Sequence, residues 1–354
     1  MVVNMLDERS RQVLRAVVQS YINKLEPVGS RFVTKEYALG CSPATIRNIM
    51  ADLEDLGFLS QPHTSAGRVP TDKGYRFYVN FLGDAGEYGE QDAELKDCVC
   101  RFTRRLEGIG SDLNGMFVEV TNALSSMSNY IGVVMPPRPE STTFNRIDFI
   151  RYKADKVVAV LLTDEGVIKN KMLSVDAAFT QEDLNRIAAY LNSEYSGRTI
   201  DEIKSMLIKK MRQEKAAWDK LITRAIKIYE EATSFAEEDF FVSGLYDVMG
   251  LPDFSDMSRI REISRAIKDK HAILKLIEEL SGVSGVQVVI GNENPVEELK
   301  GLSVVASTYK EGERPMGVIA LIGPTRMDYS KAIYMVDAIS KCISRTFEQR
   351  TEVV

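Results

Sequence analysis

Thr45, Arg47 and Asn48 place three hydrogen-bonding side chains within four residues of the chain. In the major groove of DNA, arginine pairs with the edge of guanine and asparagine with the edge of adenine. Ser42 and Ala44, just before them, add small residues, and such a stretch suits contact with a polyanion. Ser42, Ala44, Thr45, Arg47 and Asn48 are therefore predicted to contact double-stranded DNA. If one of them meets only phosphates, it positions the protein without reading its sequence.

A second group of candidates lies about fifteen residues later, between residues 61 and 71, where Gly, Pro, Ser and Thr are frequent. Arg68, beside Gly67, is expected at the rim of a hairpin, within reach of a phosphate or the narrow minor groove. The alternative is an arginine that meets only solvent. His63 is a candidate either for a phosphate contact or for capping the turn, and its reference pKa of about 6.5 makes it a weak electrostatic element. Ser65, at the predicted tip, completes the set.

Helix signals surround the first group of candidates. Ser42 suits the cap of a helix and Pro43 its first position, where the missing N–H is no loss. Apolar residues then recur at the three-and-four spacing of one helical face. They are Ile46, Ile49, Met50, Leu53 and Leu56. The acidic residues Asp52, Glu54 and Asp55 gather at the far end, so the predicted helix points its N-terminal half at DNA.

Two further helices are expected before this one and two strands after it. An amphipathic pattern covers 9–25, and a short helix capped by Ser30 leads through a Gly-containing turn to Ser42. Short strands are expected at 58–61 and 68–70. This order predicts a winged helix-turn-helix domain over residues 1–86. The alternative is a protein-interaction module, since short three-helix segments also serve that role.

Composition limits the class of protein. A chain of 354 residues exceeds a usual single domain, so two or three domains are expected. The net charge is −6, but residues 1–80 contain ten Lys and Arg against eight Asp and Glu, a local +2 that leaves −8 for the rest. A nucleic-acid site must therefore be a small positive patch confined to one part of the surface. No apolar run reaches the roughly 20 residues that span a membrane. No signal peptide is recognisable either, so a cytoplasmic protein is predicted.

Few residues support catalysis or metal binding. The four cysteines are too few and too scattered for a disulfide framework, and Cys98 and Cys100 stand closer together than a usual zinc-binding pair. The two histidines, His63 and His271, are far apart in the chain, and no serine elbow, metal-ligand pair or phosphate-binding loop accompanies them. We therefore expect no enzyme activity, no metal and no cofactor.

The rest of the chain mixes helical and extended patterns. Gly and acidic residues at 87–92 predict a linker. An apolar stripe from Leu95 to Met127, broken by Gly108 and Gly110, predicts one or two helices. Further strands are expected at 130–135, 240–242, 286–290, 302–309 and 316–322, and further helices at 259–280 and 328–347. Helices beside antiparallel strands make this part an α+β fold.

Three β-rich runs, at 146–152, 156–163 and 167–175, are joined by short turns and predict an antiparallel meander. Two or three helices follow, and the longest carries apolar residues at helical spacing from Ile200 to Tyr229. One interpretation is a helix packed on the meander. We favour a dimer sealed in part by this stripe, because helices on one face of a small sheet leave its other face uncovered.

Several stretches resemble the family of the heat-inducible transcription repressor HrcA of bacteria. They include SPATIRNIMADLE at 42–54, QPHTSAGRVPTDKGYR at 61–76, VIGNE at 289–293 and LIGPTRMDY at 321–329. The resemblance spans nearly the whole chain. Met50 departs from it, since an aspartate is common there, but this position lies on the predicted apolar face.

The resemblance implies a GAF-like domain over residues 90–142 and 240–354, interrupted by an inserted dimerisation domain over 143–239. It also implies a homodimer that binds an inverted-repeat operator upstream of chaperone genes, with the chaperonin GroEL promoting its active state. A small-molecule-sensing transcriptional regulator is the alternative, because GAF-like folds often hold small molecules in a cleft and the fold alone does not decide between the two.

Overall fold

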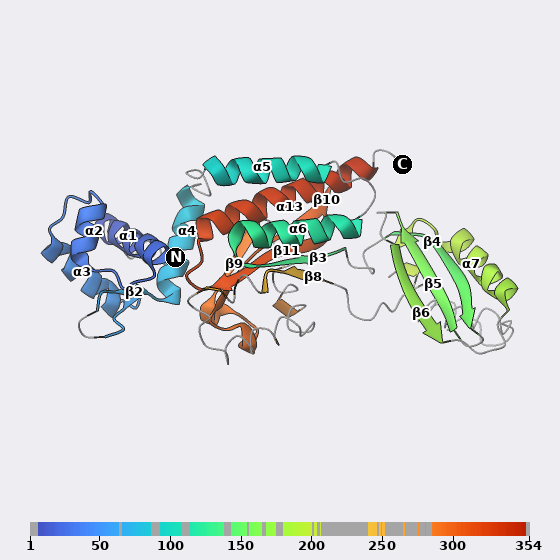
Figure 1. Cartoon of the computed structure of the whole chain (residues 1–354), viewed down its shortest axis with the longest axis horizontal. Helices are drawn as coiled ribbons and strands as arrows, with labels where there is room; N and C mark the ends of the chain where they lie inside the picture. Colours follow the sequence, from blue (N-terminus) through green and yellow to red (C-terminus); the bar gives the residue numbers. More distant parts are fainter. Residues whose placement is uncertain are drawn as a thin grey trace.

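The structure is a computed structural model. It describes residues 6–63, 66–85, 93–107, 113–137, 143–153, 156–164, 168–174, 180–199, 202–203, 206, 240–245, 248, 250–251, 265, 275–276, 280 and 285–351. These residues form a mixed α/β architecture with three separate sheets (Figure 1). None of the described helices is long and apolar enough to cross a membrane.

The N-terminal elements have the predicted order. They are α1 (Glu8–Lys24), α2 (Ser30–Glu36), α3 (Pro43–Asp55), β1 (Leu59–Ser60) and β2 (Val69–Pro70). β1 and β2 pair antiparallel, with Leu59 opposite Pro70. The three helices bury Val17, Val33, Ile46 and Leu53 completely, so the apolar periodicity of the sequence is the packing face of each helix.

Two local expectations are wrong. Ser30 is the first residue of α2 and not its cap, because Gly29 occupies the cap position and no side chain bonds there. Leu56, expected on the buried face of α3, follows the last turn of that helix and is 42% exposed. Met50 is buried, as expected from its place on the apolar face.

A helix that the sequence analysis did not identify, α4 (Asp72–Ala85), follows the β1–β2 pair. It lies between the N-terminal helices and the central sheet in Figure 1 and buries Tyr75, Tyr78 and Leu82. One apolar core runs from α1 through α4 to the central helices. The N-terminal unit is therefore packed onto the rest of the chain. The linker expected at 87–92 lies outside the described residues.

The central sheet has five strands in the order β8-β3-β11-β10-β9, all antiparallel. They are β3 (Ile131–Met135), β8 (Phe241–Ser243), β9 (Val286–Ile290), β10 (Leu302–Glu311) and β11 (Arg314–Pro324). The strands predicted near these positions are confirmed. The short 3-10 helices η4 (Gly291–Glu293) and η5 (Glu297–Leu299) link β9 to β10.

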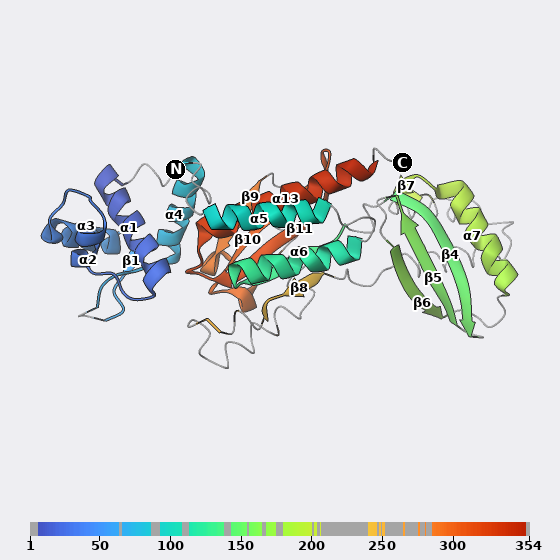
Figure 2. The ribbon, with the colours of Figure 1, turned by 45° about the horizontal axis from the view of Figure 1, so that its top comes forward.

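Three helices cover one face of the central sheet (Figure 2). They are α5 (Ala93–Glu107), α6 (Leu113–Ser128) and α13 (Tyr329–Thr351). The other face carries a second apolar cluster that includes Ile131, Val304 and Leu299. Because both faces are covered, the strands read as nearly continuous apolar runs. The helix predicted at 259–280 lies mostly outside the described residues.

The inserted sheet has four strands in the order β6-β5-β4-β7, one more than predicted. They are β4 (Thr143–Lys153), β5 (Lys156–Thr163), β6 (Ile168–Ser174) and β7 (Arg198–Thr199), and α7 (Gln181–Tyr195) packs against them. This unit has its own core, which includes Phe144, Leu161 and Leu184. The long helix predicted from Ile200 to Tyr229 lies almost entirely outside the described residues.

Candidate nucleic-acid interface

The start of α3 is fixed by its own sequence. The Ser42 side chain accepts a hydrogen bond from the Thr45 backbone N–H at 3.1 Å, and the two hydroxyl oxygens lie 2.9 Å apart. Pro43 occupies the first turn, as predicted. The cap satisfies one of the open donors at the helix N-terminus. The helix therefore begins at the residues that carry the candidate contacts.

The candidates on α3 share one exposed side. Ser42, Ala44, Thr45, Arg47 and Asn48 are all exposed. On the opposite side Ile46, Met50 and Leu53 are buried in the core, so the helix cannot turn without breaking its packing. The structure thus brings the five predicted residues together on one surface of a fixed helix.

The charge along α3 is polarised. Its first turn holds no acidic residue, and the open N–H groups there carry the positive end of the helix dipole. Asp52 and Asp55 are exposed in the last turn. A polyanion is therefore favoured at the N-terminal half and disfavoured at the C-terminal half.

Arg68 lies elsewhere than expected. Its guanidinium pairs with Glu54 of α3 at 2.7 Å, and the two side chains are only 19% and 31% exposed. Its backbone N–H and carbonyl exchange hydrogen bonds with Val28, both at 2.9 Å. The expected guanidinium at the rim of the wing is therefore replaced by one that braces the hairpin against α3. The physical reason is that pairing with Val28 turns this side chain toward Glu54.

Gly67 explains how this pairing is possible. A Cβ atom at Gly67 would lie 2.5 Å from the carbonyl carbon and oxygen of Val28, closer than any side chain tolerates. The glycine thus lets the second hairpin strand approach Val28. The sequence analysis missed this contact, and the Gly-Arg pair at 67–68 was its only local sign.

The tip of the hairpin is held by backbone contacts. The Ala66 N–H donates to the His63 carbonyl at 2.8 Å, and Gln61 Nε2 donates to the Ala66 carbonyl at 2.9 Å. The His63 side chain is exposed, so the turn uses its backbone while the imidazole faces solvent. Ser65 lies outside the described residues.

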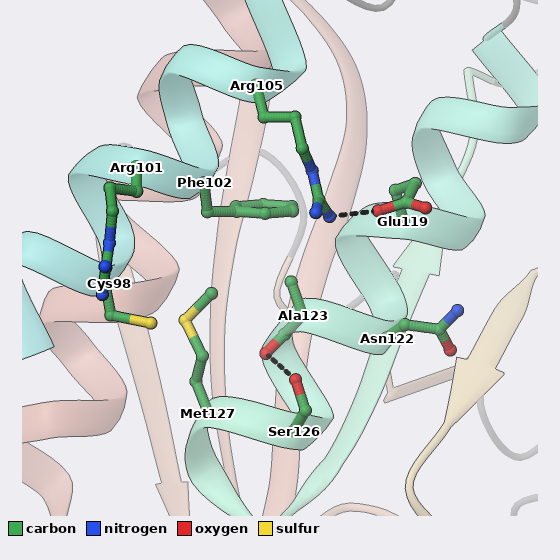
Figure 3. Close-up of a pocket in the computed structure, with 9 residues that line it drawn as sticks. All are labelled: Cys98, Arg101, Phe102, Arg105, Glu119, Asn122, Ala123, Ser126 and Met127. Atoms are coloured by element: carbon green, nitrogen blue, oxygen red, sulfur yellow. Dashed lines mark hydrogen bonds and ion pairs between the residues drawn. The ribbon is translucent and has the colours of Figure 1, made fainter.

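A groove of about 490 Å³ lies between α5 and α6, away from α3. Figure 3 shows Phe102 and Met127 pointing into the space between the two helices, with Arg105 facing Glu119 at the rim. Arg105 and Glu119 form an ion pair with each other, and both are exposed. The groove gives the ligand-sensing alternative a location. Among the described residues, no group of three or more His, Cys, Asp or Glu is placed to hold a metal ion.

Known proteins are similar to this chain over nearly the whole length of both sequences. A family model described as the HrcA protein C-terminal domain matches residues 114–333. A relative from Thermodesulfovibrio yellowstonii, named heat-inducible transcription repressor HrcA, is 49% identical over 97% of this chain and 98% of its own. The chain belongs to the HrcA family. A member of the same name from Geobacter sulfurreducens is 38% identical over the same shares of both chains.

The family resemblance predicted from the sequence is thereby confirmed. A crystal structure of a hypothetical protein at 2.2 Å resolution is also similar, with a TM-score of 0.64 and 24% sequence identity. The similarity covers 98% of this chain and 99% of that one. The HrcA-family chain therefore shares its overall fold with that protein.

Proposed function

We propose that this chain is a sequence-specific DNA-binding transcription repressor of heat-shock chaperone operons. The observation that supports it best is α3, whose far side is locked in the core while its N-terminal half presents five small or hydrogen-bonding residues. Residues 1–86 then form a winged helix-turn-helix domain, with α3 as recognition helix and the β1–β2 hairpin as wing. The names of the relatives supply the heat-inducible context.

Each candidate residue has a proposed role. Arg47 and Asn48 read base edges in the major groove. Ser42, Ala44 and Thr45 allow close approach and contact phosphates at the helix N-terminus.

The wing candidates divide into two groups. His63 and Ser65 contact the DNA backbone from the tip of the wing. Arg68 acts indirectly, by holding the wing against α3 and neutralising Glu54.

We infer a homodimer formed through the inserted domain, residues 143–239. α7 packs on one face of its sheet, whereas Ile150, Tyr152, Ile168 and Met172 are 52 to 62% exposed. Ile150 and Met172 both stand opposite Val158, in one row across three strands. An apolar face of this kind suits burial against a second copy. Two recognition helices related by a two-fold axis suit an inverted-repeat operator.

The central unit, residues 90–142 and 240–354, is proposed to be GAF-like and to connect DNA binding to the heat signal. On this proposal the chaperonin GroEL keeps the repressor in its active form in the cytoplasm. Heat diverts chaperonin to unfolded proteins, the repressor loses its active form, and transcription rises. This step rests on the family resemblance.

A gel-shift titration tests the proposal. The DNA is an inverted repeat from the organism's own chaperone-operon promoter, and the control is a scrambled sequence of equal length. Titrations with and without chaperonin, over a salt series, separate specific from electrostatic binding. We expect preference for the inverted repeat and a gain with chaperonin.

Two results would count against this reading. Equal binding to operator and scrambled DNA would reject the repressor function. A small molecule that co-purifies with the protein, occupies the α5–α6 groove and changes DNA affinity would favour the ligand-sensing alternative.

A further inference from the structure

α4 is joined to the edge of the central sheet by two polar contacts. In one the donor lies on α4, and in the other the acceptor does. Arg76 Nε donates to a carboxylate oxygen of Glu293 in η4 at 2.8 Å, and its Nη2 bonds the other oxygen. The same Nη2 donates to the Val288 carbonyl of β9 at 2.6 Å. A two-pronged contact of this kind fixes direction as well as distance.

In the second contact α4 supplies the acceptor. The Asp72 carboxylate of α4 accepts from the backbone N–H of Asn292 at 2.9 Å and from its side-chain Nδ2 at 2.8 Å. Gly291, at a φ of +53°, allows the approach, because a Cβ atom there would collide with the Asp72 carboxylate. We call Asp72, Arg76, Asn292 and Glu293 the α4 clasp.

A buried layer supports the clasp. Tyr75 stands between Asp72 and Arg76 in the chain. The centre of its ring lies 5.9 Å from the centre of the Tyr329 ring. The Tyr329 hydroxyl lies 2.7 Å from Ser303 Oγ and donates to the Thr325 carbonyl at 2.5 Å. Burial raises the pKa of Tyr329, so this phenol stays neutral and keeps donating. Hydrogen bonds therefore fix the tyrosine against which α4 packs.

The same helix is also attached to the DNA-binding elements. Lys73 Nζ donates to the Leu56 carbonyl at the end of α3, at 2.8 Å. The hydroxyl of Thr71, just before α4, donates to the carbonyls of Gly57 and Phe58 at 2.7 and 3.1 Å. Tyr78 bonds Gln19 of α1. α4 thus contacts the central sheet on one side and, on the other, the elements α1 to α3 with the β1–β2 hairpin, which we call the recognition unit.

We propose that the α4 clasp sets the angle at which each recognition unit leaves the central sheet, and so determines which spacing between operator half-sites the dimer accepts. This inference rests on the proposed dimeric binding to an inverted repeat. One additional base pair between half-sites rotates the second by about 35° around the DNA axis. A dimer with a fixed angle loses affinity for the altered spacing, whereas a dimer with a loose connection still binds both half-sites.

The test compares operators whose spacers are native, or longer or shorter by one, two and five base pairs, and an isolated half-site. Fluorescence anisotropy gives each affinity for wild-type protein, Arg76→Gln and Asp72→Asn. We expect the ratio of native-spacer to altered-spacer affinity to fall about 5- to 10-fold in both variants. Half-site affinity should stay within about twofold of wild type, because α3 itself is untouched.

Two further variants sharpen the test. Lys341→Gln removes an exposed ion pair with Asp337 on α13, away from the clasp, and should keep the wild-type spacer preference. The exchange Arg76→Glu with Glu293→Arg should recover part of the preference that Arg76→Glu alone loses. If Arg76→Gln does not fold, the spacer preference of Asp72→Asn alone tests the role of the clasp.

The outcomes separate the two proposals. A wild-type preference for one spacer that persists in Arg76→Gln and Asp72→Asn would overturn the role of the clasp and leave the repressor proposal standing. Wild-type protein that binds paired half-sites no better than scrambled DNA would overturn both.

Discussion

Arg47 and Asn48 directly follow Ile46, so one turn of α3 buries one side chain completely and exposes the next two. Replacing Arg47 therefore removes chemistry from the surface and little from the core. Arg68 is the opposite case, since its side chain bonds Glu54 and its backbone bonds Val28. The two arginines should respond differently to substitution.

Arg47→Ala is expected to weaken operator binding by about 1–3 kcal/mol, because a contact with a base edge is lost. Affinity for random DNA should change much less. Competition titrations with the two DNAs measure both effects. Lys341→Ala, which removes an exposed charge on α13, is the control and should leave both affinities unchanged. Equal losses on operator and random DNA would assign Arg47 to a phosphate.

Arg68→Ala is expected to lower affinity for operator and random DNA alike, because Glu54 then adds an unpaired negative charge to α3. Glu54→Gln in the same chain should restore most of that affinity. A double-mutant cycle on the free energy of unfolding should give a coupling of about 0.5–3 kcal/mol between the two residues. Independent effects of the two substitutions would contradict the bracing role.

At the scale of elements, the wing is more than a two-stranded hairpin. β2 pairs with β1, and the residue before it, Arg68, also forms a bridge with Val28 in the connection between α1 and α2. The wing is thus attached to the α1–α2 connection through its backbone and to α3 through the Arg68–Glu54 ion pair. The position of the wing relative to α3 depends on how closely the backbone at Gly67 and Arg68 approaches Val28.

Gly67→Ala is expected to destabilise the protein by about 1–3 kcal/mol, because the added methyl group meets the Val28 carbonyl and the strand must move. Thermal and denaturant unfolding measure the change. Gly29→Ala is the control for an added methyl group without a collision, since a Cβ atom there has no neighbour within 4 Å. Because Gly29 is the N-cap of α2, its cost should be limited to the less favourable cap, at the low end of about 0.5–2 kcal/mol. A Gly67→Ala protein as stable as the wild type would mean that the wing does not need this close approach.

At the scale of the whole molecule, the described residues form one core that joins the N-terminal unit to the central helices, a second on the other face of the central sheet and a third in the insert. The shared core and the α4 clasp attach the N-terminal unit to the central sheet. The insert has its own apolar core, and among its described residues none is seen to cover the sheet face that carries Ile150 and Met172. On the proposed function, assembly and DNA recognition lie in different parts of the chain.

Ile150→Asp is expected to weaken the dimer at least about tenfold, because a charge is placed on the face proposed to be buried. Sedimentation equilibrium gives the dimer constant. Binding to the inverted repeat should fall toward that of a single half-site. Val118→Asp, which changes an exposed apolar residue of α6, should leave the dimer intact. An unchanged dimer in Ile150→Asp would place the interface elsewhere.

Local sequence determined most of the elements. The cap at Ser42, the proline after it and the spacing of Ile46, Met50 and Leu53 predicted α3 and its exposed side. Apolar runs and turn residues predicted the strands of the central sheet and three of the four strands of the inserted sheet. These signals act between near neighbours, so the sequence shows them directly. α4 was not predicted, because its first residues were interpreted only as part of the family motif.

Tertiary structure alone decided what the charged residues do. Arg68 was expected to face DNA, but its partner is set by the bridge to Val28, which no periodicity indicates. Arg76 and Glu293 are 217 residues apart and meet only because α4 packs on the edge of the central sheet. A long charged side chain can point to solvent, to DNA or to another charge at similar energetic cost. Its choice is fixed by which groups the fold brings within reach.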